Sequence, residues 1–382
     1  MSIRVGAGIS TAAEPPSAAG EAAGRAAEGL SGARPELALL FASGSHLHEA
    51  QALLDGIEAE LAPLALAGCG AGGVLGEGRE HESGSAVAVL AIAFDGGGTA
   101  RTFRLDPGEE GLEQLPVLAG CTGALLLADP YTFPTELALA ELSDRAPGIP
   151  VLGGLASART DGGTPLFYDG QLQLGGAVAV TFKDVELLPC VSQGAAPLGR
   201  ELTITAAEGN LIHELAGQPA LAAIRQVIGE LSPRERMLIA SGLLVGIVID
   251  SGKPEFVQGD FLVRGVLGAD PDSGAVAVAA PVRAGQVIRL HARDARSADD
   301  DLRRALRLQR EALSGRAPAG ALVFSCNGRG RAMFGARDHD ASVLVEELGE
   351  VPSAGFFAAG EIGPVGGRSF LHGFTATIAA FV

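Results

Sequence analysis

A strand–helix–strand–strand pattern occurs three times in this sequence and constrains the fold more than any other feature. The copies span Leu37–Phe94, Ala124–Phe182 and Ala321–Phe381. Each opens with an almost wholly apolar run, which is typical of a strand buried on both faces. Each then passes through a helical stretch and a glycine-rich strand to a closing run of small and β-branched residues. We therefore expect an α/β protein with two lobes of mixed sheets, built from repeated strand–helix–strand–strand units.

Chance similarity is the alternative to a true repeat, and the length of the chain bears on the number of domains. The chain contains 55 glycines, and composition alone can produce chance echoes among segments rich in alanine and glycine. The length of 382 residues also exceeds what one core usually holds, so more than one domain is expected. A small-residue stretch at 192–199 marks the predicted boundary between an N-terminal domain, 1–195, and a C-terminal domain, 196–382. Further elements are predicted at 3–9 (strand), 15–30 and 297–315 (helices) and 270–274 (hairpin turn).

Charge and composition exclude several classes of protein. Lys and Arg total 28 against 45 Asp and Glu, a net charge of −17 with no basic cluster, so nucleic acid is not an expected partner. The longest apolar run, Met237–Ile249, is too short as a helix for a ~30 Å bilayer core, so no membrane segment is expected. No signal peptide is recognised, and the four cysteines are scattered, which fits a reducing compartment. The sequence predicts a soluble cytoplasmic protein with no metal site.

The segment Phe324–Gly330 places unusual chemistry directly after a buried strand. A thiol (Cys326), an amide (Asn327) and a guanidinium (Arg329) follow one another between glycines. Arg329 is a candidate fork for a ligand carboxylate, since guanidinium binds carboxylate through two parallel hydrogen bonds. Cys326 is either a buried thiol beside a binding turn or a nucleophile activated by the nearby cation. No catalytic triad can be assembled around it from the sequence.

Glycine-rich turns at the ends of other strands are the second candidate. Gly68–Gly73 has the spacing of a dinucleotide fingerprint, but the residues after it are loop-like, where that site needs a helix. Such a turn can instead line another pocket with backbone N–H groups. Glu361, after Gly360, places one carboxylate at a comparable strand end. Because strand ends facing a crevice are where α/β proteins hold ligands, we expect these turns and the Cys326 turn to share one pocket, with Arg329 and Glu361 close enough for one small ligand to touch both.

These residues resemble a known family. Ser325–Gly330, Ala354–Pro364 and Phe370–Thr375 look like the C-terminal FIST domain, and Leu66–Gly73 and Val151–Leu155 resemble the N-terminal FIST domain. The resemblance implies a sensory module for a small ligand, with amino acids proposed as ligands, and some bacterial members bind haem. Members are often fused to signalling output domains, for which this chain has no room. Gly70 departs from the serine that members often carry after the cysteine, which removes one possible hydroxyl contact.

Together these observations predict a stand-alone sensory protein without catalytic activity that binds an amino acid or a similar small carboxylate. A separate signalling output protein is an expected partner. Two alternatives stay open: an enzyme that uses Cys326 and Glu361 in a cleft between the lobes, and a haem-binding gas sensor with an axial histidine or cysteine. The candidate ligand-binding residues are Gly68, Cys69, Gly70, Gly153, Gly154, Cys326, Asn327, Arg329, Gly360, Glu361 and His372.

Overall fold

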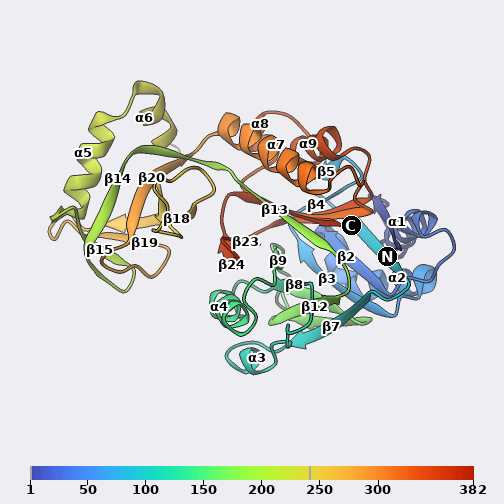
Figure 1. Cartoon of the computed structure of the whole chain (residues 1–382). Coiled ribbons are helices and arrows are strands. Elements are labelled where there is room, and N and C mark those ends of the chain that lie inside the picture. Colours follow the sequence, from blue (N-terminus) through green and yellow to red (C-terminus); the bar gives the residue numbers. More distant parts are fainter. Residues whose placement is uncertain (1, 241) are drawn as a thin grey trace. The chain divides into compact units, whose positions relative to one another are not determined.

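The chain folds into two compact units, shown in a computed structural model that describes residues 2–240 and 242–382 (Figure 1). The larger unit comprises the chain up to Val191 together with Leu302–Leu371 and Ala376–Val382. The smaller unit comprises Ser192–Asp301 and His372–Thr375. The predicted boundary at residue 195 therefore lies close to the first crossing between units. The predicted C-terminal domain, however, contributes to both units, because the chain returns to the larger one at Leu302.

The larger unit contains the three predicted copies, with the predicted order of elements. In each copy a helix connects the opening strand to a second strand that pairs parallel with it. A closing strand then pairs antiparallel with the opening strand. Copy one contains β2 (Leu37–Ser43), η1 (Gly44–Glu49), α2 (Ala50–Leu61), β3 (Ala65–Ala71), β4 (Val74–Gly76), β5 (Arg79–His81) and β6 (Ala86–Asp95). Copy two contains β8 (Gly123–Ala128), α4 (Thr135–Arg145), β9 (Val151–Leu155), β10 (Pro165–Tyr168), β11 (Gln171–Leu174) and β12 (Ala177–Lys183). Copy three contains β21 (Gly320–Cys326), α8 (Arg331–Phe334), α9 (His339–Leu348), β22 (Ser353–Ala358), β23 (Glu361–Val365), β24 (Arg368–His372) and β25 (Thr375–Phe381).

Each copy also contains a short two-stranded hairpin that the sequence did not predict. The hairpin leaves its own copy and extends the sheet of another. The β4–β5 hairpin of copy one joins β22 of copy three, β23–β24 of copy three joins β9 of copy two, and β10–β11 of copy two joins β3 of copy one. The exchange is cyclic, so the three copies interlock with approximate threefold symmetry. The sheet orders are β1-β6-β2-β3-β10-β11, β24-β23-β9-β8-β12-β7 and β13-β25-β21-β22-β4-β5.

The remaining elements of the chain frame these sheets. A strand before each copy, namely β1 (Ser2–Ser10), β7 (Thr99–Leu105) or β13 (Leu187–Gln193), lies beside that copy's closing strand. Apart from two helices of the smaller unit, the helices that residues 2–240 and 242–382 form outside the copies are α1 (Pro15–Gly29), α3 (Glu110–Glu113) and α7 (Ala295–Ala312), of which α1 and α7 agree with the predicted ranges. No helix among residues 2–240 and 242–382 is long and apolar enough to cross a bilayer.

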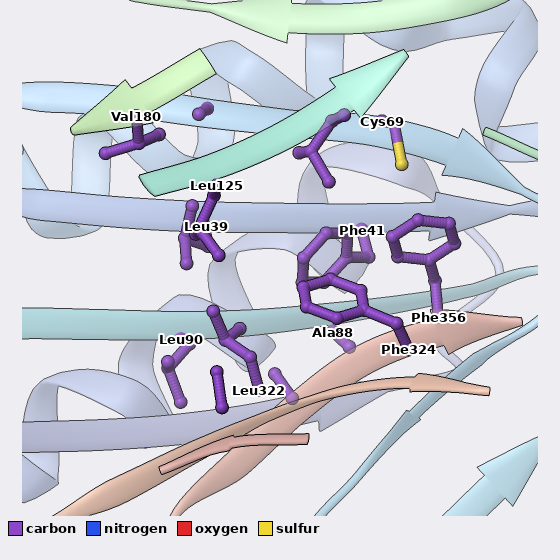
Figure 2. Close-up of a cluster of buried hydrophobic side chains, with 14 of the residues drawn as sticks. Leu39, Phe41, Cys69, Ala88, Leu90, Leu125, Val180, Leu322, Phe324 and Phe356 are labelled. Carbon is purple, nitrogen blue, oxygen red and sulfur yellow. The ribbon is translucent and has the colours of Figure 1, made fainter. Parts of the chain in front are cut away.

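One apolar core joins the three sheets. Phe41 of copy one packs against Phe324 and Phe356 of copy three, with ring centroids 6.5 and 5.1 Å apart, and leucines from all three opening strands belong to the same cluster (Figure 2). Burial of such large side chains contributes about 1.5–3 kcal/mol each. The core therefore makes the three copies a single folding unit.

A glycine at one register position holds each pair of parallel strands together. Gly68, Gly153 and Gly355 lie opposite Leu40, Leu126 and Val323 of the opening strands. A Cβ on these glycines would lie 1.9, 2.1 and 1.8 Å from the carbonyl oxygen of the opposite residue. Gly68 and Gly153, both predicted to bind ligand, therefore have a packing role that explains why they are glycine.

The smaller unit is an antiparallel sheet closed on itself. Its order is β14-β20-β17-β18-β19-β15-β16, and β14 also pairs with β15. The predicted turn at Asp270–Gly274 joins two of these strands, and the apolar run Met237–Ile249 divides between the end of a helix and β17. The elements are β14 (Ala195–Glu208), β15 (Leu211–Leu215), β16 (Gln218–Pro219), α5 (Ala220–Glu230), α6 (Pro233–Ile239), β17 (Leu244–Val248), β18 (Phe261–Ala269), β19 (Val276–Val278) and β20 (Val287–Arg293).

Candidate functional site

The three copies meet at one point on the larger unit, which we call the junction and define by Gly72, Ser157 and Asn327. The Gly72 N–H donates to Ser157 Oγ at 2.8 Å, and the Ser157 hydroxyl donates to the Phe357 carbonyl. A Cβ built on Gly72 would lie 3.8 Å from Asn327 Oδ1. Gly72 and Asn327 are exposed, so solvent reaches the junction.

Backbone hydrogen bonds bring the predicted strand ends to this junction. The Asn327 N–H donates to the Ala358 carbonyl at 2.9 Å, which ties the Cys326 turn to the end of β22. The Leu155 N–H donates to the Gly360 carbonyl at 2.8 Å, and Glu361 pairs opposite Gly154. Segments of three different copies thus meet at the junction, and the part of the Gly68–Gly73 turn that reaches it is its end. That these turns bind one ligand together stays a prediction.

Glu361 occupies a position that is apolar in the other two copies. It pairs opposite Gly154, one residue after the close-packed Gly153, at the register position where Val74 pairs opposite Phe356 and Leu166 opposite Cys69. Val74 and Leu166 are part of the apolar core, and Glu361 is likewise 0% exposed. A buried carboxyl is costly, and the symmetry of the fold does not require it here. This departure makes Glu361 the strongest functional candidate in the unit.

Arg329 has a different role from the one predicted. Its guanidinium is fully buried and forks onto Asp340, with Nε 2.7 Å from Oδ2 and Nη2 2.8 Å from Oδ1. Ser325 also donates to Asp340, at 2.7 Å. The predicted two-pronged contact with a ligand carboxylate is therefore corrected, because Asp340 already takes both prongs. Only Nη1 of this guanidinium is buried without a hydrogen-bond partner among residues 2–240 and 242–382.

The charges around Arg329 are not balanced. Burial acts to lower its pKa, but the charge and hydrogen bonds of Asp340, with smaller contributions from Cys326 and Glu361, raise that pKa overall. Burial would raise the pKa of Asp340, yet Arg329, with help from His339 and Ser325, holds it well below its usual range. The Arg329–Asp340 pair is neutral as a whole. The Glu361 carboxyl is therefore the group that can give the site a net negative charge.

The thiol of Cys326 lies at the edge of this cluster. It is 7% exposed, and the Gly328 N–H points to its sulfur at 3.4 Å. On the other side of the turn, the Phe334 ring stacks on His339 with centroids 3.4 Å apart and lies 5.1 Å below the Arg329 guanidinium. The aromatic pair closes off Arg329 from that side.

The remaining predicted residues lie away from the junction. Cys69 is a residue of the apolar core (Figure 2), and burial strongly raises its thiol pKa, so it has a packing role, and its predicted ligand contact stays a prediction. A Cβ on Gly70 would meet Leu47 and Pro165, so this glycine packs against its neighbours. His372 is buried and belongs to the smaller unit, and its predicted part in ligand binding stays a prediction.

Two cavities of the same unit lie elsewhere. One of about 770 Å³ is lined by residues that include Phe94, Leu187 and Arg316, and one of about 660 Å³ includes Glu77 and Val351. Neither lining contains a histidine or cysteine, so neither fits a haem that needs such an axial ligand.

Reasoning from sequence missed Ser157 and Asp340. Ser157 could have been found by aligning the copies, because it lies four residues after Gly153, as Gly72 does after Gly68. Asp340 gave no comparable signal, since an acidic residue in the first turn of a helix is usually an exposed partner of the helix dipole.

Comparison with known proteins agrees with the resemblance seen in the sequence. The chain matches the FIST N domain over residues 36–218 and the FIST C domain over residues 220–364. Uncharacterised proteins of Mycobacterium tuberculosis and Mycobacterium bovis are 43% identical over 391 residues, covering 100% of this chain and 100% and 99% of theirs. Among solved structures, a hydrolase from A. caulinodans titled as acting on "cyanuic acid" covers 100% of this chain and 99% of its own at a TM-score of 0.27 and 11% identity. PurLQS from Thermotoga maritima covers 99% and 72% at a TM-score of 0.21 and 13% identity. These two scores are too low to bear on the fold.

Proposed function

Because the chain belongs to the family in which a FIST N domain is followed by a FIST C domain, we propose that it is a sensory protein that binds a small ligand at the junction. The domains indicate a role in sensing or signal transduction. The ligand is an amino acid or a similar small carboxylate, and a separate protein receives the signal.

The charges of the site favour a zwitterion over a simple anion. Glu361 supplies a carboxyl for an ammonium group, next to a pair, Arg329 and Asp340, that is already neutral. Nη1 of Arg329 is one donor for a ligand carboxylate, and the Asn327 side-chain amide at the exposed mouth is a second. A ligand that carried only negative charge would meet Glu361 without a compensating cation.

The observation that carries the proposal is the buried carboxyl of Glu361 at a position that is apolar in the two other copies. Val74 and Leu166 fill the same place with apolar side chains of the core in the other two copies. Residues retained at such a cost are typical of binding sites, because polar groups in an apolar pocket fix the orientation of a ligand.

A thermal-shift screen of the common amino acids, with their deaminated carboxylates alongside, tests this function. We expect at least one amino acid to raise Tm, because a ligand at 100 times its Kd adds about 2.7 kcal/mol of apparent stability. Glu361→Gln should weaken its binding about 10- to 100-fold, since a hydrogen bond to a charged group contributes about 1.5–3 kcal/mol. Glu113→Gln makes the same change on the exposed face of α3 and should leave the Kd unchanged.

Two results would contradict the proposal. One is a screen in which no amino acid shifts Tm. The other is a hit that binds Glu361→Gln as tightly as the unchanged protein, which would place its site elsewhere.

A second candidate is an enzyme that uses the Cys326 thiol as a nucleophile. The observation in its favour is the Gly328 N–H directed at the sulfur, beside the buried cation of Arg329, because such donors stabilise a thiolate. Alkylation by iodoacetamide, read by mass spectrometry, separates the two candidates. Labelling of Cys326 faster than that of the more exposed Cys121 would favour the enzyme, and slower labelling favours the sensor.

A further inference from the structure

The hairpin of copy one is fastened to the start of α9 by two reciprocal hydrogen bonds. Glu80, on β5, accepts the Ala341 N–H on Oε1 at 3.0 Å. In return, the Glu80 N–H donates to Oδ1 of Asp338, the residue before the helix, at 2.7 Å. A capping residue usually lies next to its helix in the sequence. Glu80 lies in another copy, yet it has the same role, because it satisfies a free N–H of the first helical turn.

This fastening places Glu80 among other carboxylates. Its second oxygen, Oε2, is buried and has no hydrogen-bond partner among residues 2–240 and 242–382. Among the nearby cations, Arg329 is forked onto Asp340, and Arg79 lies 3.5 Å from Asp338 with 72% of its side chain exposed. The titratable and charged groups on the segments that meet here are Arg79, His81, Glu82, Arg329, Arg331, Asp338, His339 and Asp340.

Both the geometry and the charges favour a protonated Glu80. Burial, followed by the charge of Asp340 and more weakly that of Glu82, raises the pKa of Glu80 to about 7, against the opposing effect of the backbone N–H groups of Ala341 and Asp340. When the proton leaves to solvent, a buried carboxylate with one unsatisfied oxygen faces Asp340. The cost is relieved if the Glu80 side chain turns to water, which breaks its bond to the Ala341 N–H and leaves the backbone bond from Glu80 to Asp338 alone at the start of α9.

We propose that Glu80 is a proton-operated latch that holds the start of α9, and with it the Asp340 side chain that orients Arg329, against the hairpin of copy one. Below neutral pH the latch is closed and Arg329 is fixed behind the junction. Above it the latch opens, and the Arg329–Asp340 pair loses its support. The latch rests on these contacts alone, while its consequence for ligand binding rests on the proposed function.

The sign of the pH effect on stability follows from linkage. The unfolded chain releases the Glu80 proton near the ordinary pKa of 4.5, and the folded protein retains it to about 7. Between these values the folded state binds more protons than the unfolded state. The free energy of unfolding should therefore fall as pH rises from about 4.5 to about 7 and should level off above.

Hydrogen exchange at single amides tests the latch. The probe is the N–H group of Ala341, followed by NMR from about pH 5.5 to about pH 8.5 and corrected for the exchange rate of an unstructured peptide. We expect the protection of this N–H to fall about tenfold or more between pH 6 and pH 8. Glu80→Gln keeps the acceptor oxygen without the titrating proton. In this variant the protection of the Ala341 N–H should therefore not change with pH. Glu82→Gln makes the same change on the same hairpin, where the carboxyl accepts the Arg331 N–H at 2.8 Å, and should behave like the unchanged protein.

Three results would overturn the latch: protection that does not change with pH in the unchanged protein, a fall that persists in Glu80→Gln, or a fall abolished equally by Glu82→Gln. Denaturant unfolding of the unchanged protein over the same pH range gives a second readout that needs no variant, and a free energy of unfolding that does not fall toward pH 7 also contradicts the proposal. A screen that finds no ligand would refute the proposed function but leave both of these measurements decisive for the latch.

Discussion

Asp340→Ala is expected to lower the free energy of unfolding by about 3–5 kcal/mol, measured by denaturant titration at neutral pH. The substitution leaves the Arg329 guanidinium fully buried without the carboxylate that accepts its Nε–H and Nη2–H. It also removes the acceptor of the Ser325 hydroxyl. An unpaired buried charge is among the few single changes that cost this much.

Two controls separate the buried charge from the loss of a contact. Replacing both partners, Arg329→Met with Asp340→Leu, should recover most of the loss, because an apolar pair leaves no charge unpaired. Glu141→Ala breaks an exposed pair with Arg145 on α4 and should cost less than about 0.5 kcal/mol. If Asp340→Ala is as mild as Glu141→Ala, Arg329 is reached by water, and its burial in the structure is wrong.

Gly355→Ala is expected to destabilise the protein by about 3 kcal/mol or more, the upper end of what overpacking costs. The added Cβ would lie 1.8 Å from the Val323 carbonyl oxygen, which belongs to the backbone of β21. Relief requires β21 and β22 to separate, and both carry large side chains of the core that joins the three copies. Thermal unfolding should show a large fall in Tm.

The matched control for this substitution lies in α1. Gly20→Ala adds the same Cβ with no atom within 4 Å, in a helix, and should stabilise the protein by about 0.5–1 kcal/mol. Opposite signs for the two changes are the expected pattern. If Gly355→Ala and Gly20→Ala change the stability equally, the register of β22 against β21 is not as the structure shows.

The frame of the fold could be predicted from the sequence because its signals are local. The apolar opening strands, the helices after them and the closing strands of three copies all lie in their predicted segments. The exchanged hairpins could not be predicted. Strands as short as Val74–Gly76 carry little pattern, and their partners lie in another copy far along the chain. Register between distant segments depends on tertiary packing, which no local pattern encodes.

Some features of the candidate site could also be predicted from the sequence, and others could not. The Cys326 turn and Glu361 stood out because polar residues between glycines after buried strands are unusual. In the structure the turn is bonded to the end of β22 and Glu361 pairs opposite Gly154, while their shared part in ligand binding stays a prediction. The use of the Arg329 fork was not predictable, since its partner Asp340 is a residue of the first turn of α9 and becomes a neighbour only when the helix docks. The glycine-rich segment around Cys69 was predicted to be a ligand turn. In the structure Cys69 lies on β3 within the core, and Gly68 allows β3 to pack closely against β2.

Glu361→Val tests the central claim most directly, because it gives copy three the residue that copy one carries as Val74. The measurement pairs the free energy of unfolding with calorimetric titration of the amino acid that gives the largest shift in Tm. If Glu361 serves a ligand, the variant should be as stable as the unchanged protein or more stable, because the Arg329–Asp340 pair stays neutral without it, while binding weakens by about 10- to 100-fold or is lost. A variant that loses about 3–5 kcal/mol of stability, or that binds the amino acid as tightly as before, would show that the Glu361 carboxyl is a structural partner and would contradict the account.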